Sequence, residues 1–318
     1  MKKHFILIML IVIATACSDD YLDRPPLDSI SSASVFQDEA LTESYLYRVY
    51  RFLPIGYGDI TPGYGWRFIL GSITDESRSK SGWIASNKRW IPGDISPITN
   101  DLNNWGYLYS GIRRANVLIT ELESSSLSDE FRTRITAEAR YLRAWFYFDL
   151  TRRWGAVPLI LVAQDPDDDL STPKTSREDI YMFIDKELDA IAADIPLHSE
   201  VKANGESGRV TRETVWSLSS RINLFAENFS KSALSSKKVL DAGFVLQNDY
   251  DKLFQSYGGD PEVIFEITFD FPNNGHNFDM LNLPFSLRTD WGSQTNPTQE
   301  LVDAYEMAST GLPITDPL

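Results

Sequence analysis

The sequence EARYLRAWFYFDLTRRWGAVPLI, residues 138–160, is the most informative stretch of this 318-residue chain. Within it and just before it, apolar side chains recur every three or four residues, the spacing of one helix face. Aromatic residues cover the adjoining faces, and a helix that is apolar nearly all round is buried. The residues of this pattern are Ile135, Ala139, Tyr141, Leu142, Trp145, Phe146, Phe148 and Leu150. Ser128 can cap the start, and Gly155 and Pro158 can end it, so we predict a long central helix.

Shorter segments on both sides show the same helical spacing. They are residues 34–53, a segment that follows Asn100 and Asp101, 176–195, 211–225 and 232–242. Helices that follow one another in pairs through modest loops are typical of TPR-like hairpins, although the TPR consensus itself fits poorly. Strand signals are sparse, and residues 263–269 are the only convincing run. We therefore predict a mostly α fold of TPR-like helical hairpins, with long irregular loops and few short strands.

Residues 55–100 lose the helical period and are rich in Gly, Pro, Ser, Asn and Trp. Connections this long are functional or disordered, and the aromatic content argues against disorder. An exposed indole is rigid and offers a flat face to the C–H side of a sugar ring. Polar neighbours, among them Asn87 and Asp101, can pair with sugar hydroxyls. The candidate ligand-binding residues are Trp66, Arg67, Asp75, Trp83, Trp90, Asn100 and Trp291.

A second interpretation of the loop tryptophans stays open. Long loops need apolar anchors, so Trp66, Trp83, Trp90 and Trp291 can equally plug into the helical core. The remaining tryptophans fall in or at the end of helix patterns, where core packing is the expected role. They are Trp105, Trp145, Trp154 and Trp216.

Composition excludes several classes of protein. The chain has 30 Lys and Arg against 45 Asp and Glu, a formal charge of −15. Binding to nucleic acid or to anionic lipid requires a basic surface, so neither partner is expected. One Cys and three His leave no basis for a disulfide framework or a Cys-based zinc cluster.

The sequence predicts neither catalysis nor a cofactor. Phosphate-binding, zinc-protease and serine-hydrolase motifs are absent. Asp165, Asp167 and Asp169 resemble the start of a calcium loop, but Leu170 and Ser176 replace the Gly and Glu that such a loop needs. Asp75 and Glu76 are a conceivable glycosidase pair, although adjacent residues do not face each other across a substrate.

The N-terminus is typical of a secretory signal. Residues 1–16 combine a basic start, a run of nine apolar residues and small residues before Cys17. Small residues before a Cys resemble a bacterial lipobox, so we predict residues 1–16 as a signal peptide and Cys17 as a lipidation site. Residues 17–26 are acidic and Pro-rich, which predicts an extended tether. An ordinary signal peptide with an incidental Cys is the alternative.

Residues 138–160 closely resemble the signature of the SusD/RagB family. Other segments are similar to family elements in the same order along the chain. They are residues 105–116, 208–212, 239–254, 261–265 and 297–306. The resemblance covers residues 27–318, which we take as one SusD-like helical domain. Family members usually run well beyond this length, so the C-terminal part is expected to be missing.

The resemblance implies a lipid-anchored, non-enzymatic protein of the outer membrane that faces the cell exterior. It would bind an oligosaccharide and pass it to a SusC-like TonB-dependent transporter, with no cofactor or metal. The family's ligand residues follow no fixed motif, so none is transferred to this chain. A peptide-binding RagB-like protein, a surface glycosidase and a helical scaffold for protein partners remain alternatives.

Overall fold

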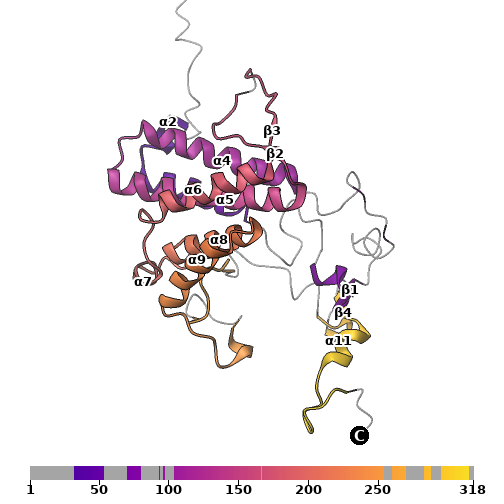
Figure 1. Cartoon of the computed structure of the whole chain (residues 1–318). Coiled ribbons are helices and arrows are strands. Elements are labelled where there is room, and N and C mark those ends of the chain that lie inside the picture. Colours follow the sequence, from indigo (N-terminus) through magenta and orange to yellow (C-terminus); the bar gives the residue numbers. More distant parts are fainter. Residues whose placement is uncertain are drawn as a thin grey trace, which may run out of the picture.

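The computed structural model describes residues 32–53, 70–79, 93, 96, 104–165, 167–253, 260–269, 283–287 and 295–314. All but the last of its described helices form one body, and a smaller unit near the C-terminus lies beside it (Figure 1). The helices are α2 (Ser32–Val35), α3 (Glu39–Tyr50), α4 (Trp105–Glu123), α5 (Asp129–Trp154), α6 (Arg177–Ile191), α7 (His198–Ala203), α8 (Arg212–Phe225), α9 (Phe229–Asp241) and α11 (Gln299–Ala304). This arrangement confirms the predicted mostly α fold.

Helix α5 is the centre of the body, as its sequence predicts. It packs against α4 on one side and α6 on the other, and it also contacts α3 and α8. Ser128 caps the N-terminus, where its hydroxyl accepts a hydrogen bond from the Phe131 amide. Gly155 ends the helix at φ 71°, a left-handed conformation that favours glycine. Phe146 and Tyr147 are fully buried, so the aromatic face of α5 forms the middle of the core.

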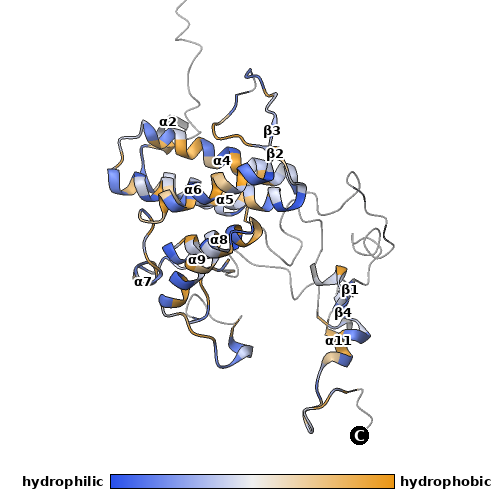
Figure 2. Ribbon diagram, viewed as in Figure 1, coloured by the Kyte–Doolittle hydropathy of each residue, from blue (hydrophilic) through white to orange (hydrophobic). Residues whose placement is uncertain are grey.

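The α4–α5 contact depends on one glycine. A Cβ atom at Gly111 would lie 2.9 Å from Phe146 Cε2 and 2.9 Å from Phe52 Cβ. Atoms do not approach that closely without strain, so the two helices fit together only because Gly111 has no side chain. Figure 2 shows that the larger helices of the body carry both apolar and polar residues, as amphipathic helices around a core should.

Two sequence predictions for the helical segments are wrong in detail. The segment 34–53 is split into α2 and α3, because the Asp38 side chain accepts a hydrogen bond from Leu41 N and starts a new helix there. Helix α4 starts after Asn104 rather than after Asn100 and Asp101, which lie outside the described residues. The Asn104 side-chain amide instead donates to Asp149 of α5, so it joins two helices and does not cap one.

Residues 263–269 form no strand, which corrects the prediction made from their apolar run. The Ile264 carbonyl accepts a hydrogen bond from the Thr214 hydroxyl of α8 at 3.4 Å. The Phe265 ring lies 6.4 Å from that of Tyr141 on α5. The apolar side chains therefore pack against helices, and the described part of the chain offers this segment no partner strand.

The smaller unit is built around a two-stranded antiparallel sheet. Strand β1 (Ser77–Ser79) follows the 3₁₀ turn η2 (Leu70–Ile73) and pairs with β4 (Thr295–Pro297), which leads into α11. A second pair, β2 (Val157–Pro158) with β3 (Lys174–Thr175), closes the loop between α5 and α6. Two more 3₁₀ turns, η4 (Tyr250–Lys252) and η5 (Phe285–Leu287), complete the described elements. None of the helices described here has the length and apolar character to span a bilayer.

The tryptophans predicted for the core lie at its border. Trp105, Trp145 and Trp154 are partly buried and pack against the core, and the Trp105 and Trp154 rings meet edge to face at 5.5 Å. Trp216 is also partly buried, and the Lys238 ammonium lies 5.7 Å from its ring centre. Their packing role is therefore confirmed for three of the four.

Candidate functional site

Of the predicted ligand residues, the structure describes Asp75. Its side chain is exposed, in the bend between η2 and β1. Six predicted ligand residues and the predicted lipidation site lie outside the described residues, and so do residues 1–16 and 17–26. These are Trp66, Arg67, Trp83, Trp90, Asn100, Trp291 and Cys17. Their roles therefore stay predictions.

The β1–β4 pair joins two distant parts of the chain beside Asp75. Ser79 lies opposite Thr295, and Ser77 lies opposite Pro297. Thr298 caps α11 and also donates to the bend before β1, through its amide to the Glu76 carbonyl at 3.0 Å and through its hydroxyl to the Asp75 carbonyl. The segments that continue to Trp83 and come from Trp291 are thus held side by side at Ser79 and Thr295.

Asp75 and Glu76 do not form a glycosidase site in the described structure. Both side chains are exposed, on consecutive residues. A glycosidase acid works from an apolar pocket across the substrate from its partner carboxylate. An exposed neighbouring pair is suited to hydrogen bonding with a ligand.

A second candidate site is a cavity of about 500 Å³ on the helical body. Its walls are Tyr47 and Tyr50 of α3, the turn 205–209 and the extended residues 265–268. We call it the Tyr47 cavity. Two other cavities, of about 510 and 420 Å³, lie between α4 and residues 160–170 and between α6 and the α8–α9 turn. Three lining residues of the Tyr47 cavity, Tyr50, Glu206 and Arg209, belong to one ionic network.

Glu138 of α5 is at the centre of that network and is fully buried. Arg209 holds both of its carboxylate oxygens, through Nη2 at 2.7 Å and Nε at 3.2 Å. Tyr50 donates its hydroxyl to Glu138 Oε2 at 2.6 Å and accepts the Val210 amide at 2.9 Å. The network therefore joins α3 and α5 to the turn that precedes α8.

Arg209 is surrounded by three carboxylates, those of Glu138, Glu43 and Glu206. Its Nη1 also donates to Glu43 at 2.7 Å and to Glu206 at 2.9 Å. Burial alone would lower the pKa of Arg209, but the charge and hydrogen bonds of Glu138 outweigh it and raise that pKa further. Burial, reinforced by the Glu138 charge, raises the pKa of Tyr50 well above its ordinary value. Arg209 therefore stays charged and Tyr50 neutral across the physiological pH range.

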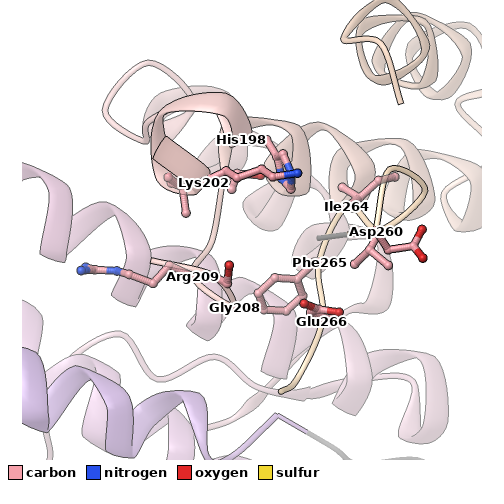
Figure 3. Close-up of a pocket in the computed structure, with 12 residues that line it drawn as sticks. His198, Lys202, Gly208, Arg209, Asp260, Ile264, Phe265 and Glu266 are labelled. Carbon is pink, nitrogen blue, oxygen red and sulfur yellow. The ribbon is translucent and has the colours of Figure 1, made fainter. Parts of the chain in front are cut away.

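A smaller pocket shares residues 207–209 and 265–266 with the Tyr47 cavity (Figure 3). It has a volume of about 30 Å³ and is lined by His198, Lys202, Asp260 and residues that also reach the Tyr47 cavity. That volume admits a water molecule or two and no larger ligand. Gly208 lines both this pocket and the Tyr47 cavity. Its φ is 86°, and a Cβ at this position would lie 3.7 Å from the Glu266 carbonyl oxygen.

Sequence reasoning missed the ionic network. Residues 208–212 were noted only as a family element, and the Glu within the apolar helix pattern was not singled out. The available signal was Glu138 itself, because a charged residue among buried apolar neighbours requires a partner of opposite charge. The partner is Arg209, 71 positions away, which spacing along the chain cannot identify.

The acidic loop at residues 165–169 shows no calcium site. The Asp168 carboxylate accepts the Asp165 amide at 2.7 Å, and that of Asp169 accepts the Ser171 amide at 2.9 Å. The hydrogen bond from the Ser171 backbone lowers the pKa of Asp169. Among the described residues there is no group of three potential metal ligands.

Comparison with known proteins places the chain in a family. Residues 20–224 match the SusD-like family model described as "starch-binding associating with outer membrane". A SusD-like protein of Bacteroides ovatus is 24% identical over 89% of this chain and 50% of its own length. A SusD-like protein of Formosa agariphila is 26% identical over 54% of this chain and 35% of its own length. The chain thus spans half the length of these relatives or less.

Solved structures show the same fold. A SusD-like carbohydrate-binding protein from Bacteroides fragilis superposes with a TM-score of 0.76 at 24% identity, over 89% of this chain and 56% of that one. A laminarin-binding SusD-like protein superposes with a TM-score of 0.64 at 23% identity, over 78% of this chain and 56% of that one. With the family model matching well over half of its residues, this chain belongs to the SusD-like family.

Proposed function

We propose that this chain captures oligosaccharides at the outer surface of the outer membrane and passes them to a SusC-like TonB-dependent transporter. The observation that carries the proposal is the match of residues 20–224 to a family described as starch-binding and associated with the outer membrane. The carbohydrate-binding and laminarin-binding proteins with the same fold support the choice of ligand class. No step of this proposed cycle breaks a bond in the ligand.

The proposed capture site is the loop face that carries Trp66, Trp83, Trp90 and Trp291. Indole faces would stack on sugar rings, and Arg67, Asp75 and Asn100 would pair with hydroxyl groups. The β1–β4 pairing supports this assignment, because β1 ends at Ser79 directly opposite Thr295, where β4 begins. Trp83 and Trp291 are each four residues along the chain from that pair. Four extended residues span at most ~14 Å, so the proposal assigns both tryptophans to the surroundings of that pair.

Attachment to the membrane would come from the N-terminus. Removal of residues 1–16 would leave Cys17 as an acylated first residue, and residues 17–26 would serve as the tether to the domain of residues 27–318. Each buried methylene of an acyl chain contributes ~0.8 kcal/mol, so several chains anchor a protein stably. A Cys17→Ser variant should move from the membrane fraction to the soluble fraction, whereas a neutral Ser18→Ala variant should not. Equal membrane retention of both would contradict the anchor.

Calorimetric titration of the full chain tests the capture site. Laminarin oligosaccharides, starch oligosaccharides and a mixed peptide digest are the separate probes. We expect one glycan to bind, and the Trp83→Ala and Trp291→Ala variants each to bind it about tenfold more weakly, a loss of ~1.4 kcal/mol. Tyr250→Ala removes an exposed aromatic side chain of η4 that is not among the predicted ligand residues, and this variant should bind as the wild type does. Binding of peptides with no glycan binding would instead favour a peptide-capture role.

A further inference from the structure

The Tyr47 cavity is built like a small-molecule site. Its volume of about 500 Å³ falls within the usual range of such pockets, ~300–1,000 Å³. It combines an aromatic wall with hydroxyl and carboxylate groups, supplied by Ser207, Thr268, Glu206 and Glu266. A concave surface with one apolar wall and a few polar groups is the arrangement that fixes a ligand's orientation.

The aromatic wall is both accessible and fixed in place. Tyr47 is 46% exposed, so its ring is available to a ligand. The Arg209 guanidinium carbon lies 5.8 Å from the centre of that ring, and the Tyr50 ring lies 6.5 Å away. Arg209 is itself held by the buried Glu138. A ring packed against a fixed cation is pre-organised, which reduces the entropy lost on binding.

The charges of the cavity favour a neutral ligand. Two arginines and two glutamates line it, so its formal charges cancel. Both carboxylate oxygens of Glu206 are engaged, Oε1 by Arg209 at 2.9 Å and Oε2 by Arg134 at 2.9 Å. An ionic ligand would therefore lose its hydration and meet no net opposite charge in the cavity. Carboxylate oxygens keep spare lone pairs, however, and these can accept hydrogen bonds from hydroxyl groups.

We propose that the Tyr47 cavity binds one neutral sugar unit. One ring face of the sugar lies on Tyr47, and its hydroxyl groups point toward Glu206 and Ser207. This site is separate from the proposed capture site and requires none of the loop tryptophans. A chain with both sites would hold a long glycan at two points, which raises the effective concentration of the second contact.

Saturation-transfer difference NMR on the full chain tests the proposal, with D-glucose, D-galactose and N-acetyl-D-glucosamine as separate probes. We expect transfer to the ring protons of at least one sugar, and about tenfold weaker binding of that sugar to Tyr47→Ala. Tyr305→Ala is the matched control, because Tyr305 is also exposed and lies in the α11 unit, and it should leave binding unchanged. Ile267→Arg is a second test, since Ile267 is 40% exposed at the cavity and a long charged side chain there should block it.

The outcomes separate this site from the capture site. No transfer to any of the three sugars, or equal binding by wild type, Tyr47→Ala and Ile267→Arg, would overturn the Tyr47 site. Signal lost in a Trp83→Ala/Trp291→Ala variant but kept in Tyr47→Ala would also overturn it, while leaving the capture proposal intact. A Tyr47-dependent signal in a chain that binds no oligosaccharide by calorimetry would support this site and reject the capture site alone.

Discussion

The two helical hairpins α4–α5 and α8–α9 have similar shapes but are held together by different contacts. Between α4 and α5 the contact is mainly apolar, with Leu108, Ile112, Leu142 and Phe146 all at or near zero exposure. Between α8 and α9 it includes a set of hydrogen-bonded serines. Hydroxyl pairs join Ser219 to Ser235 at 3.1 Å and Ser220 to Ser236 at 2.6 Å, and Ser232 donates to the Ser220 carbonyl at 2.9 Å.

Several apolar residues of α9 are exposed instead. Phe229 is 63% exposed, and Leu234 and Leu240 are also exposed. Burial of apolar surface contributes ~25 cal/mol per Å², whereas a neutral hydrogen bond contributes only ~1 kcal/mol net. The α4–α5 contact should therefore dominate the stability of the body, and α8–α9 should be the first part to open. Ion pairs from Lys231 to Asp185 and Asp189, each at 2.6 Å, attach α9 to α6.

Two Phe→Ala substitutions, one in each hairpin, should differ most in their effect on the free energy of unfolding. Phe146→Ala should lower the free energy of unfolding by ~3–5 kcal/mol, because it leaves a cavity in the core. Phe229→Ala on the exposed side of α9 should change it by less than ~0.5 kcal/mol. Guanidinium unfolding curves measure both values. Similar losses for the two variants would mean that the α8–α9 surface is not free in solution.

The ion pairs between α5 and α6 should make the stability of the helical body sensitive to acid. Glu187 accepts hydrogen bonds from Arg140 at 2.7 Å and Arg143 at 2.9 Å. Burial alone would raise the pKa of Glu187, but these two arginines outweigh it and hold the pKa below its ordinary 4.5. Glu187→Gln at neutral pH should cost ~1.5–3 kcal/mol, the worth of charge-assisted hydrogen bonds.

The sign of the pH effect follows from this depressed pKa. As pH falls below 4.5, the unfolded chain takes up a proton at Glu187 before the folded chain does, so stability decreases. The difference between wild type and Glu187→Gln should therefore shrink in acid. Substitutions in the serine contact should show no such trend, because serine hydroxyls do not titrate. A wild-type advantage that is constant down to acid pH would contradict the assigned ion pairs.

Two glycines of α4 test how tightly the apolar hairpin is packed. Gly111→Ala should cost ~1–3 kcal/mol, since the new Cβ would lie 2.9 Å from Phe146 and from Phe52. Gly106→Ala meets no atom within 4 Å and should be neutral or stabilising by up to ~1 kcal/mol. Thermal unfolding by circular dichroism distinguishes the two. Tolerance of both substitutions would show that α4 and α5 pack less closely than described.

The smallest expected effect is in the serine contact. Ser219→Ala alone should cost ~1–2 kcal/mol, because it leaves the buried Ser235 hydroxyl without that partner. The double variant Ser219→Ala/Ser235→Ala should cost less than the sum of the two single variants. A double-mutant cycle by urea unfolding measures this coupling. Strict additivity would mean that the hydroxyl pair does not contribute to the hairpin.

These two hairpins also show how far the sequence determines the fold. Helix α5 was predicted with both ends, because Ser128, Gly155 and the apolar spacing are local signals. The serine contact was not predicted, since a serine that faces another helix looks the same in sequence as one that faces water. The run at 263–269 was misread as a strand for a related reason: its apolar side chains pack on α5 and α8, and only the tertiary structure shows that.

The candidate site was less predictable than the fold. The loop tryptophans were chosen by residue type and composition, and Asp75 is the predicted ligand residue that the structure describes. Its surroundings depend on the β1–β4 pair, which joins residues more than 200 positions apart. The Tyr47 cavity depends likewise on Arg209 reaching Glu138 from a distant turn. Contacts of such long range leave no periodic pattern in the sequence.

The most direct test of the central claim, that the chain captures glycans and leaves them uncut, is one titration with two readouts. The purified full chain is titrated calorimetrically with laminarin and starch oligosaccharides, and the same samples are assayed for new reducing ends. The account predicts saturable heat of binding with at least one glycan and no increase in reducing ends. Reducing ends that accumulate with wild-type chain and not with Asp75→Asn/Glu76→Gln, or no heat with any glycan, would contradict it.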